Sequence, residues 1–340
     1  MSLYPFFRWL LFRLKPEAAH QLTLHAIRTA GDIGPINTLL NHIYSAPNQP
    51  VSAFGLDFRN PIGLAAGYDK DGIAWKGLGC LGFGHIEIGT VTPKPQAGNP
   101  KPRLFRLPRE HALINRLGFP GSGADFVLEQ ILKERPQNLV LGVNIGKNKD
   151  TPIDKAVTDY LSLLRLFASH ADYLAINVSS PNTVGLRRLQ EKQALDRLLR
   201  LLNEERKTIS AGDQQRIPIV VKLSPDLEDD QLVEALEVLM ANEMDGVIAG
   251  NTTIRREGVS SALAREEGGL SGRPLFTRSL SMVEKIQKAT RGSLAVIGAG
   301  GIHDGASARR MLDAGATLVQ LYTGLIYQGP GLVKNILLGL

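Results

Sequence analysis

Eight short apolar runs between residues 60 and 324 each lead into residues that could hold a ligand. The residues at these ends are Lys70, Thr90, Asn144, Asn177, Lys222, Asn251, Gly301 and Thr323. For any one asparagine a turn is the simpler interpretation, but several asparagines gathered with two lysines favour a binding site. Because an amide both donates and accepts hydrogen bonds, such a set suits a neutral, planar ligand with alternating N–H and C=O groups. A pyrimidine-like ring is one ligand of this kind.

The stretch NVSSPNT, residues 177–183, places small polar side chains around one proline. It contains no histidine, carboxylate or thiol. A serine hydroxyl has a pKa far above neutrality, so it acts as a base only with a relay through water or a neighbouring hydroxyl. The residues alone therefore leave Ser180 open between a turn-capping serine and a catalytic one.

Glycines follow the last two apolar runs. The segment IGAGGI, residues 297–302, lacks the third glycine of a dinucleotide-binding motif because His303 stands in that place. It follows the seventh run, and YTG follows the eighth, where barrel enzymes frequently bind phosphate through backbone N–H groups. This placement predicts a phosphorylated cofactor or substrate.

The elements that must position these residues alternate regularly from residue 50 onward. The eight runs are strand candidates, and between them lie amphipathic stretches with leucines three and four apart, such as residues 194–205 and 230–244. Eight such units predict a (β/α)₈ TIM barrel over residues 46–340. A doubly wound open sheet is the alternative, but the even spacing and the lack of a dinucleotide motif favour closure. Short two-stranded pieces between residues 51 and 115 are expected as flaps over one barrel end.

The first 45 residues differ from the rest. The segment MSLYPFFRWLLFRLKPEAAH is basic and aromatic, its arginines interrupt the apolar run, and it is too short and too charged to cross a bilayer. A helix from about Pro5, broken at Pro16 and then restarted, would lie in the membrane interface. An ordinary helical cap over the core is the alternative. We expect residues 1–45 to form a small helical lid whose apolar face enters the lipid and guides the quinone toward the barrel.

Composition limits the class of protein further. The chain has 340 residues, 43% hydrophobic content and 35 glycines, which suits a globular enzyme. A single cysteine, Cys80, excludes an internal disulfide framework and fits a reducing compartment. The net charge of +6 could indicate nucleic acid or anionic membrane, or only solubility.

Many ordered motifs carry a resemblance to a known family. They include NPIGLAAGYDKDG, IEIGTVTPKPQAGNPKPRLFRL, LINRLGF, GVNIGKNKDT, INVSSPNTVGLR, GGLSGRPL, GAGGI and QLYTGLIYQGP. With these motifs the chain resembles the class 2 dihydroorotate dehydrogenases, which are membrane-associated, quinone-using FMN flavoproteins of pyrimidine biosynthesis. The resemblance covers essentially the whole length. It implies oxidation of (S)-dihydroorotate to orotate, with FMN as hydride acceptor and a membrane quinone as final oxidant, in the synthesis of UMP.

The resemblance gives Ser180 a role. In this family the matching serine is the general base that takes a proton from C5 of dihydroorotate while hydride leaves C6 for the flavin N5. The soluble class uses a cysteine there, and Cys80 lies far away in the sequence. Lys222 would lie beside the flavin and stabilise its anionic reduced form. A Schiff-base role for Lys222 is the alternative, but no other feature supports an aldolase.

The resemblance also assigns the two binding sites, with no metal. The residues implied for the substrate are Lys70, Asn115, Arg116, Leu117, Gly118, Phe119, Asn177, Asn182, Asn251 and Thr252. Those implied for FMN are Ala66, Gly67, Tyr68, Asp69, Lys70, Thr90, Asn144, Asn177, Lys222, Gly250, Gly272, Gly301, Tyr322 and Thr323. His20 and Arg106 match positions near the quinone path. The chain departs from the family pattern at two places. Gly250 stands where serine or threonine is usual, and Pro120–Gly121 replaces an asparagine pair.

The expected partners are dihydroorotate or orotate, a membrane quinone and membrane lipid, without nucleic acid. The expected location is peripheral, on the cytoplasmic face of the bacterial inner membrane. Two rival functions exist. A dihydrouridine synthase would use a catalytic cysteine that this region lacks. A catalytically silent membrane-bound barrel is excluded if the purified protein carries FMN and reduces a dye with dihydroorotate.

Overall fold

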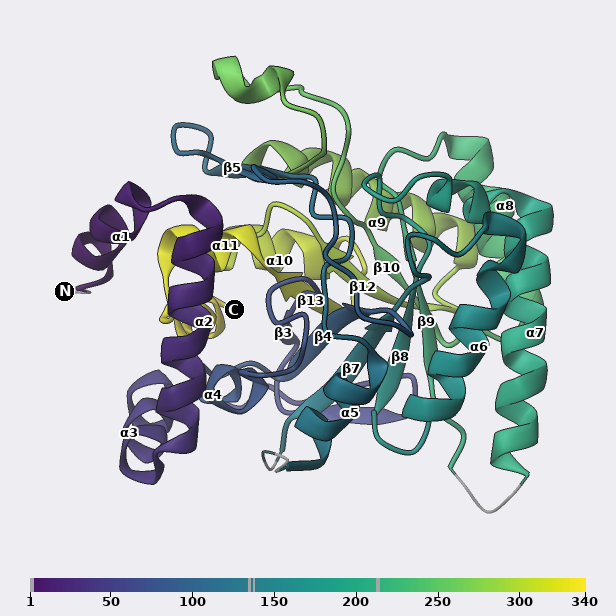
Figure 1. The fold of residues 1–340 in the computed structure, drawn as a ribbon, viewed down its shortest axis with the longest axis horizontal. Helices are drawn as coiled ribbons and strands as arrows, with labels where there is room; N and C mark the ends of the chain where they lie inside the picture. Colours follow the sequence, from purple (N-terminus) through teal and green to yellow (C-terminus); the bar gives the residue numbers. More distant parts are fainter. Residues whose placement is uncertain (1–2, 134–135, 137, 212–214) are drawn as a thin grey trace.

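The computed structural model describes residues 3–133, 136, 138–211 and 215–340. Its centre is a closed barrel of eight parallel strands, in the order β10, β12, β13, β3, β4, β7, β8, β9 (Figure 1). The strands are β3 (Ile62–Leu64), β4 (His85–Val91), β7 (Val140–Ile145), β8 (Tyr173–Asn177), β9 (Ile219–Leu223), β10 (Gly246–Ala249), β12 (Ala295–Ala299) and β13 (Leu318–Leu321). Each lies within one of the eight apolar runs, so the predicted TIM barrel is confirmed.

Helices surround the strands and complete the repeating unit. They are α4 (Trp75–Gly79), α5 (Ala124–Lys133), α6 (Ala156–Phe167), α7 (Lys192–Ser210), α8 (Asp229–Ala241), α9 (Phe276–Thr290), α10 (Gly305–Asp313), α11 (Thr323–Gln328) and α12 (Leu332–Gly339). The predicted helical stretches 194–205 and 230–244 correspond to α7 and α8. Short 3₁₀ turns at 153–155, 186–190, 262–265 and 273–275 complete the connections.

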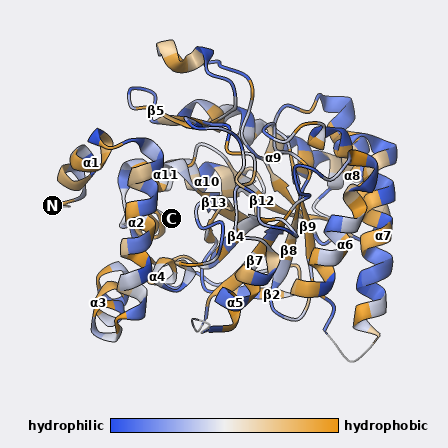
Figure 2. Ribbon diagram, in the orientation of Figure 1, coloured by the Kyte–Doolittle hydropathy of each residue, from blue (hydrophilic) through white to orange (hydrophobic). Residues whose placement is uncertain are grey.

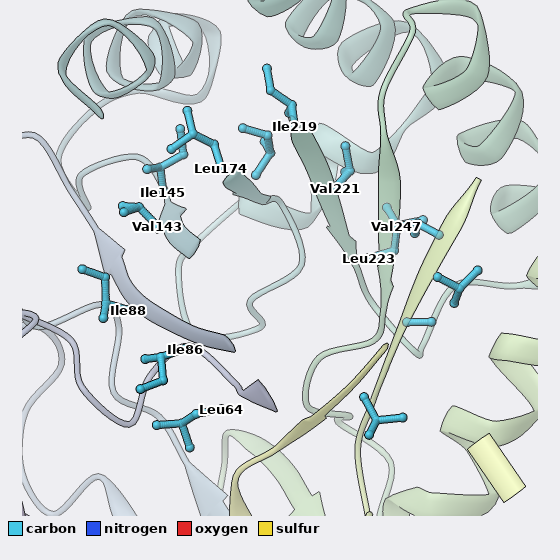
Figure 3. Close-up of a cluster of buried hydrophobic side chains, with 14 of the residues drawn as sticks. Leu64, Ile86, Ile88, Val143, Ile145, Leu174, Ile219, Val221, Leu223 and Val247 are labelled. Atoms are coloured by element: carbon cyan, nitrogen blue, oxygen red, sulfur yellow. The ribbon is translucent and has the colours of Figure 1, made fainter. Parts of the chain in front are cut away.

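Successive side chains of each strand point to opposite faces of the barrel wall, and this alternation divides the core into two parts. One set of side chains packs between strands and helices in the larger core, and Figure 3 draws 14 of them as sticks, among them Ile86, Val143 and Val221. The other set fills the barrel interior. At the amino ends of the strands this interior is apolar, with Val220, Ile297 and other residues in a second cluster. Both clusters exclude water and hold the strand ends in fixed positions.

The short strands outside the barrel lie at both of its ends, so the prediction of flaps over one end is wrong. The hairpin of β1 (Val51–Ala53) and β2 (Leu56–Phe58) packs Phe58 into the interior cluster at the amino ends. At the other end, β5 (Leu104–Leu107) and β6 (Ala112–Asn115) form a sheet with β11 (Gly269–Gly272). The strand β11 was not predicted, because its pairing with β6 joins segments more than 150 residues apart.

Three helices precede the barrel at one side of the molecule (Figure 1). They are α1 (Tyr4–Arg13), α2 (Pro16–Asp32) and α3 (Gly34–Tyr44), so the predicted break at Pro16 is confirmed. In α2, Gly31 lies against α4 so closely that an added Cβ would be 2.6 Å from the Gly77 nitrogen. The division of the chain into a lid at 1–45 and a barrel at 46–340 stays a prediction.

Candidate active site

A cavity lies at the carboxyl ends of the barrel strands. Most of the residues named from the sequence line it: Ala66, Gly67, Lys70, Thr90, Asn115, Leu117, Gly118, Phe119, Asn177, Ser180, Asn182, Lys222, Gly250, Asn251, Thr252, Gly272, Gly301, Tyr322 and Thr323. These residues come from nearly every strand end and from the β5–β6–β11 sheet. The barrel thus brings together groups that lie up to 257 positions apart in the chain.

Four of the residues named for substrate and FMN do not line this cavity. Tyr68 lies on its far side and faces the N-terminal helices. The Asp69 carboxylate accepts hydrogen bonds from the backbone N–H groups of Ile73 and Ala74, at 3.0 and 2.7 Å, and so fixes the loop that carries Lys70. Arg116 pairs with Glu266 at 2.7 Å. The fourth, Asn144, lies beneath the cavity in the barrel interior and bonds residues that do line it.

A connected network of amides and hydroxyls forms one wall. The Asn177 side chain donates to Thr90 Oγ1 at 2.9 Å and to Asn144 Oδ1 at 3.2 Å. The Asn251 amide donates to Ser179 Oγ at 2.9 Å. Such mutual bonding fixes the amide orientations before a ligand arrives.

Asn182 and Asn115 form a second amide pair across the cavity mouth. The Asn182 amide nitrogen donates to Asn115 Oδ1 at 3.1 Å. Asn182 is on the loop after β8, whereas Asn115 ends β6. This pair therefore joins the β5–β6–β11 sheet to the loop after β8 that carries Ser180 (the serine loop), and it holds the two amides close together.

Ser180 is almost fully buried at the cavity wall. Its Oγ accepts a hydrogen bond from the Asn182 backbone N–H at 3.3 Å. Within the described part of the chain this is its one side-chain hydrogen bond, so the hydroxyl proton and the second lone pair suit a ligand or a water, as a base with a relay requires.

Lys70 is one of the two lysines that line the cavity. Its Nζ donates to the Gly67 carbonyl. Burial lowers the pKa of Lys70 to about 8, against the opposing effect of the carboxylates of Asp71 and Asp69. At neutral pH the side chain is mostly charged, yet it is poorly solvated and so suited to an anionic ligand.

On the side of the cavity opposite the amides, glycines allow a ligand to approach the backbone closely. Gly300 and Gly301 have φ of 116° and 76°, conformations that favour glycine. A Cβ on Gly272 would lie 3.0 Å from Thr323 Cγ2. Bare backbone N–H groups and the Ser271–Thr323 hydroxyl pair, 2.8 Å apart, make this side a suitable phosphate cradle.

A second cavity lies between the N-terminal helices and the barrel. It is lined by Leu11, Phe12, His20 and Arg106, among others, and it shares Tyr322 with the large cavity. Burial lowers the pKa of His20 to about 3, so its ring is neutral. Arg106 donates to the Leu11 carbonyl at 3.1 Å and so ties α1 to β5.

The two departures from the family pattern are compatible with the fold. A Cβ on Gly250 would lie 3.1 Å from Met282 Sδ, so a larger residue would need small shifts. Gly121 pairs with Gln96, and an isolated bridge of two 3.0 Å backbone hydrogen bonds fixes the loop there. The backbone geometry of this loop therefore does not depend on an asparagine pair.

Sequence reasoning missed several residues that support the site. The Arg187 guanidinium donates to the Ser179 carbonyl at 3.0 Å and to the Thr252 carbonyl at 3.2 Å, and it pairs with Asp226 at 3.0 Å. It thus connects the loops after β8, β9 and β10. Glu87, in the barrel interior, was also missed. Its signal was present: a carboxylate inside an apolar strand, IEI, is unusual enough to need an explanation.

A closed barrel with a polar, glycine-lined cavity at the carboxyl ends of its strands defines a (β/α)₈-barrel enzyme. The family model described as dihydroorotate dehydrogenase matches residues 50–340. The dihydroorotate dehydrogenase (quinone) of Cellvibrio japonicus is 47% identical over 332 residues, 97% of this chain and 96% of that protein. That of Paraburkholderia phymatum is 47% identical over 335 residues, 98% of this chain and 96% of that protein.

Solved structures agree. The crystal structure of DHODH from Eimeria tenella in complex with ferulenol has a TM-score of 0.86 and 38% identity, covering 95% of this chain and 89% of that one. The chain belongs to the dihydroorotate dehydrogenase family, whose members are flavoenzymes and oxidoreductases, and it falls with the quinone-dependent class 2.

Proposed function

We propose that this chain oxidises (S)-dihydroorotate to orotate and passes the electrons to a membrane quinone, in the synthesis of UMP. The quinone-dependent dehydrogenases that it matches over nearly their full length support this reaction. The observation that carries it in the structure is the convergence of Lys70, the amide wall and Ser180 on one cavity. A planar amide ring bearing a carboxylate is the ligand that this combination fits.

FMN fits the remainder of the cavity. The glycine cradle at Gly272, Gly300 and Gly301 would hold its phosphate, and the Gln320 Oε1, a buried acceptor with no partner among the described residues, is free for a ring N–H. Thr90, Asn144, Asn177 and Lys222 would surround the ring system, with further backbone contacts at 66–70 and 322–323. FMN, when bound, supplies the acceptor for the hydride that leaves C6 of the substrate.

Ser180 would take the proton from C5. Its hydroxyl is a poor base, so the proton must pass onward through a water or a neighbouring hydroxyl. The roles of the protein groups are then distinct: Lys70 attracts the carboxylate, Asn115, Asn177, Asn182 and Asn251 orient the ring, and Ser180 removes the proton.

The quinone would occupy the cavity lined by His20 and Arg106. Tyr322 borders both cavities, so an acceptor placed there lies close to the flavin site without displacing substrate. The neutral His20 ring and the aromatic side chains suit a quinone head better than a charged ligand.

Residues 1–45 would dock on the membrane. Figure 2 shows hydrophobic colour on the outer parts of α1 and α3. Phe6, Phe7 and Trp9 are 60%, 53% and 53% exposed, and Leu39 is 56% exposed, which is unusual for a water-facing surface. Among the described helices none is both long and apolar enough to cross a bilayer. Peripheral attachment by α1–α3 to the cytoplasmic face of the bacterial inner membrane is the location we propose.

The central test is flavin content and flavin reduction. Purified full-length protein should be yellow, release one FMN per chain and become bleached anaerobically by dihydroorotate. Reoxidation should follow addition of a quinone. Well-folded protein that cannot take up FMN, or whose FMN dihydroorotate does not reduce, would contradict the proposal.

The membrane proposal has a separate test in the full chain. Phe7→Glu with Leu10→Glu should abolish co-sedimentation with vesicles that contain anionic lipid, because both side chains would have to enter the interface. Val233→Glu is the matched control, since Val233 is a 45% exposed apolar residue on α8, distant in sequence from the lid. Equal sedimentation of the two variants would rule out docking through α1.

A further inference from the structure

A carboxylate is buried in the barrel interior, directly under the large cavity. Glu87 lies on β4 between the outward-facing Ile86 and Ile88, and its side chain is 0% exposed. Burying a charge without partners costs several kcal/mol, and even a paired buried charge is often no more stabilising than apolar residues of the same volume. Stability is therefore a poor explanation for a carboxylate at this position.

The carboxylate is fully hydrogen-bonded by groups from other strands. Its Oε1 accepts from Asn144 Nδ2 at 2.8 Å, and its Oε2 accepts from Gln320 Nε2 at 2.8 Å and from the Tyr173 hydroxyl at 3.1 Å. Lys222 Nζ lies 3.6 Å from Oε1. The cluster thus joins five strands, β4, β7, β8, β9 and β13, around one negative charge.

The tyrosine reaches this carboxylate only because Gly142 has no side chain. A Cβ on Gly142 would lie 2.2 Å from Tyr173 Cζ. Burial and the neighbouring Glu87 raise the pKa of Tyr173 well above its ordinary value. The phenol consequently stays protonated and donates its hydrogen bond to the Glu87 carboxylate.

The cluster connects directly to the cavity through two groups that line it, Lys222 and Gln320. An ionised carboxylate only accepts hydrogen bonds, so the Gln320 amide must turn its nitrogen to Glu87 and its oxygen away. That oxygen is the buried acceptor without a partner among residues 3–133, 138–211 and 215–340. Glu87 therefore fixes both the charge balance and the donor–acceptor pattern beneath the cavity.

We propose that Glu87 is a positioning residue that partly neutralises Lys222 and orients Gln320, and thereby holds the reduction potential of the bound flavin down. The inference rests on the proposed FMN site. A reduced flavin carries more negative charge than an oxidised one, so an uncompensated Lys222 would over-stabilise it. With the carboxylate 3.6 Å away, the pair presents less positive charge, and the reduced cofactor is a better donor to the quinone.

The test is the midpoint potential of the FMN-loaded, full-length protein, measured by equilibration with redox dyes. In Glu87→Gln the shape and one acceptor remain but the charge is lost. We expect the equilibrium constant for flavin reduction to rise at least tenfold, which is about 30 mV for a two-electron couple. Tyr173→Phe is the matched control, because it removes one hydrogen bond from the same carboxylate and changes no charge. Its potential should move by less than a third as much.

A second pair of variants covers the case in which Glu87→Gln does not fold. Lys222→Met should lower the potential, and Lys222→Met with Glu87→Gln should raise it again because the negative charge of the carboxylate is lost. The doubly substituted protein leaves no buried ion without a partner, so it keeps the fold. Identical potentials with and without the carboxylate, in either background, would overturn the inference while the wild-type protein still reduces FMN with dihydroorotate. If the wild-type protein binds no FMN, the proposed function fails as well.

Discussion

The affinity for the product anion should fall steeply as the pH rises through about 8. Burial lowers the pKa of Lys70 to about 8 in the free protein. The lysine is then about 90% protonated at pH 7 and about 10% protonated at pH 9. Only the protonated form attracts a carboxylate, so orotate should bind about tenfold more weakly at pH 9 than at pH 7. The bound anion raises the pKa of Lys70. The affinity therefore falls with pH only between the pKa of the free lysine and the higher pKa of the lysine in the complex.

The neighbouring titratable groups do not produce the same profile. The pKa of Asp69 is raised to about 6, mainly by burial, and that of His20 is lowered to about 3, again by burial. Neither changes its charge much between pH 7 and 9. Because the pKa of Lys70 is lowered, its contribution to the free energy of unfolding increases between about pH 8 and 10.5, where the unfolded chain binds more protons at this group. The titration of Lys70 by itself therefore does not destabilise the fold in this range.

The assay is titration of the oxidised enzyme with orotate at pH 6.5 to 9, followed calorimetrically or by the flavin spectrum. Lys70→Arg should flatten the profile, because a guanidinium stays charged throughout. Lys70→Met should bind weakly at every pH. A wild-type affinity that is constant across this range, or a Lys70→Met profile that matches the wild-type one, would refute the assignment of Lys70 to the substrate carboxylate.

Three further predictions concern the serine, its supporting loop and the lid. Ser180→Ala should keep its flavin but slow flavin reduction by dihydroorotate at least about 100-fold in rapid mixing; a near-normal rate would remove Ser180 from the mechanism. Arg187→Ala should slow the same step about tenfold or more by releasing the serine loop, with Arg187→Lys recovering part of it and flavin content unchanged. Equal rates in all three proteins would show that the clamp is dispensable. Deletion of residues 2–40, or of 2–13 if the longer deletion unfolds, should leave flavin reduction by dihydroorotate intact. Turnover with long-chain quinones and binding to vesicles should both fall sharply. Unchanged quinone turnover by the folded, truncated protein would show that the lid is merely structural.

Local pattern was sufficient for the barrel. Each of the eight strands is a short run of apolar residues in which one set of side chains faces the helices and the other the interior, and turn residues bound it. That information lies within ten residues of sequence, so the eight barrel strands and the break at Pro16 could be predicted without any long-range contact. The gathering of the strand-end residues in one site could be predicted in the same way, because parallel strands bring their carboxyl ends to one edge.

The tertiary structure alone decided which polar groups meet. The sheet of β5, β6 and β11 depends on pairing Asn115 with Gly269, and no local signal marks a partner so distant in the chain. Arg187 reads in sequence as a solvated charge, yet in the fold it binds two loop carbonyls and Asp226. The charge balance at Lys222 depends on a 3.6 Å distance to Glu87 across the barrel. Such distances arise only when the closed barrel turns alternate side chains inward, and that closure is a property of all eight strands together.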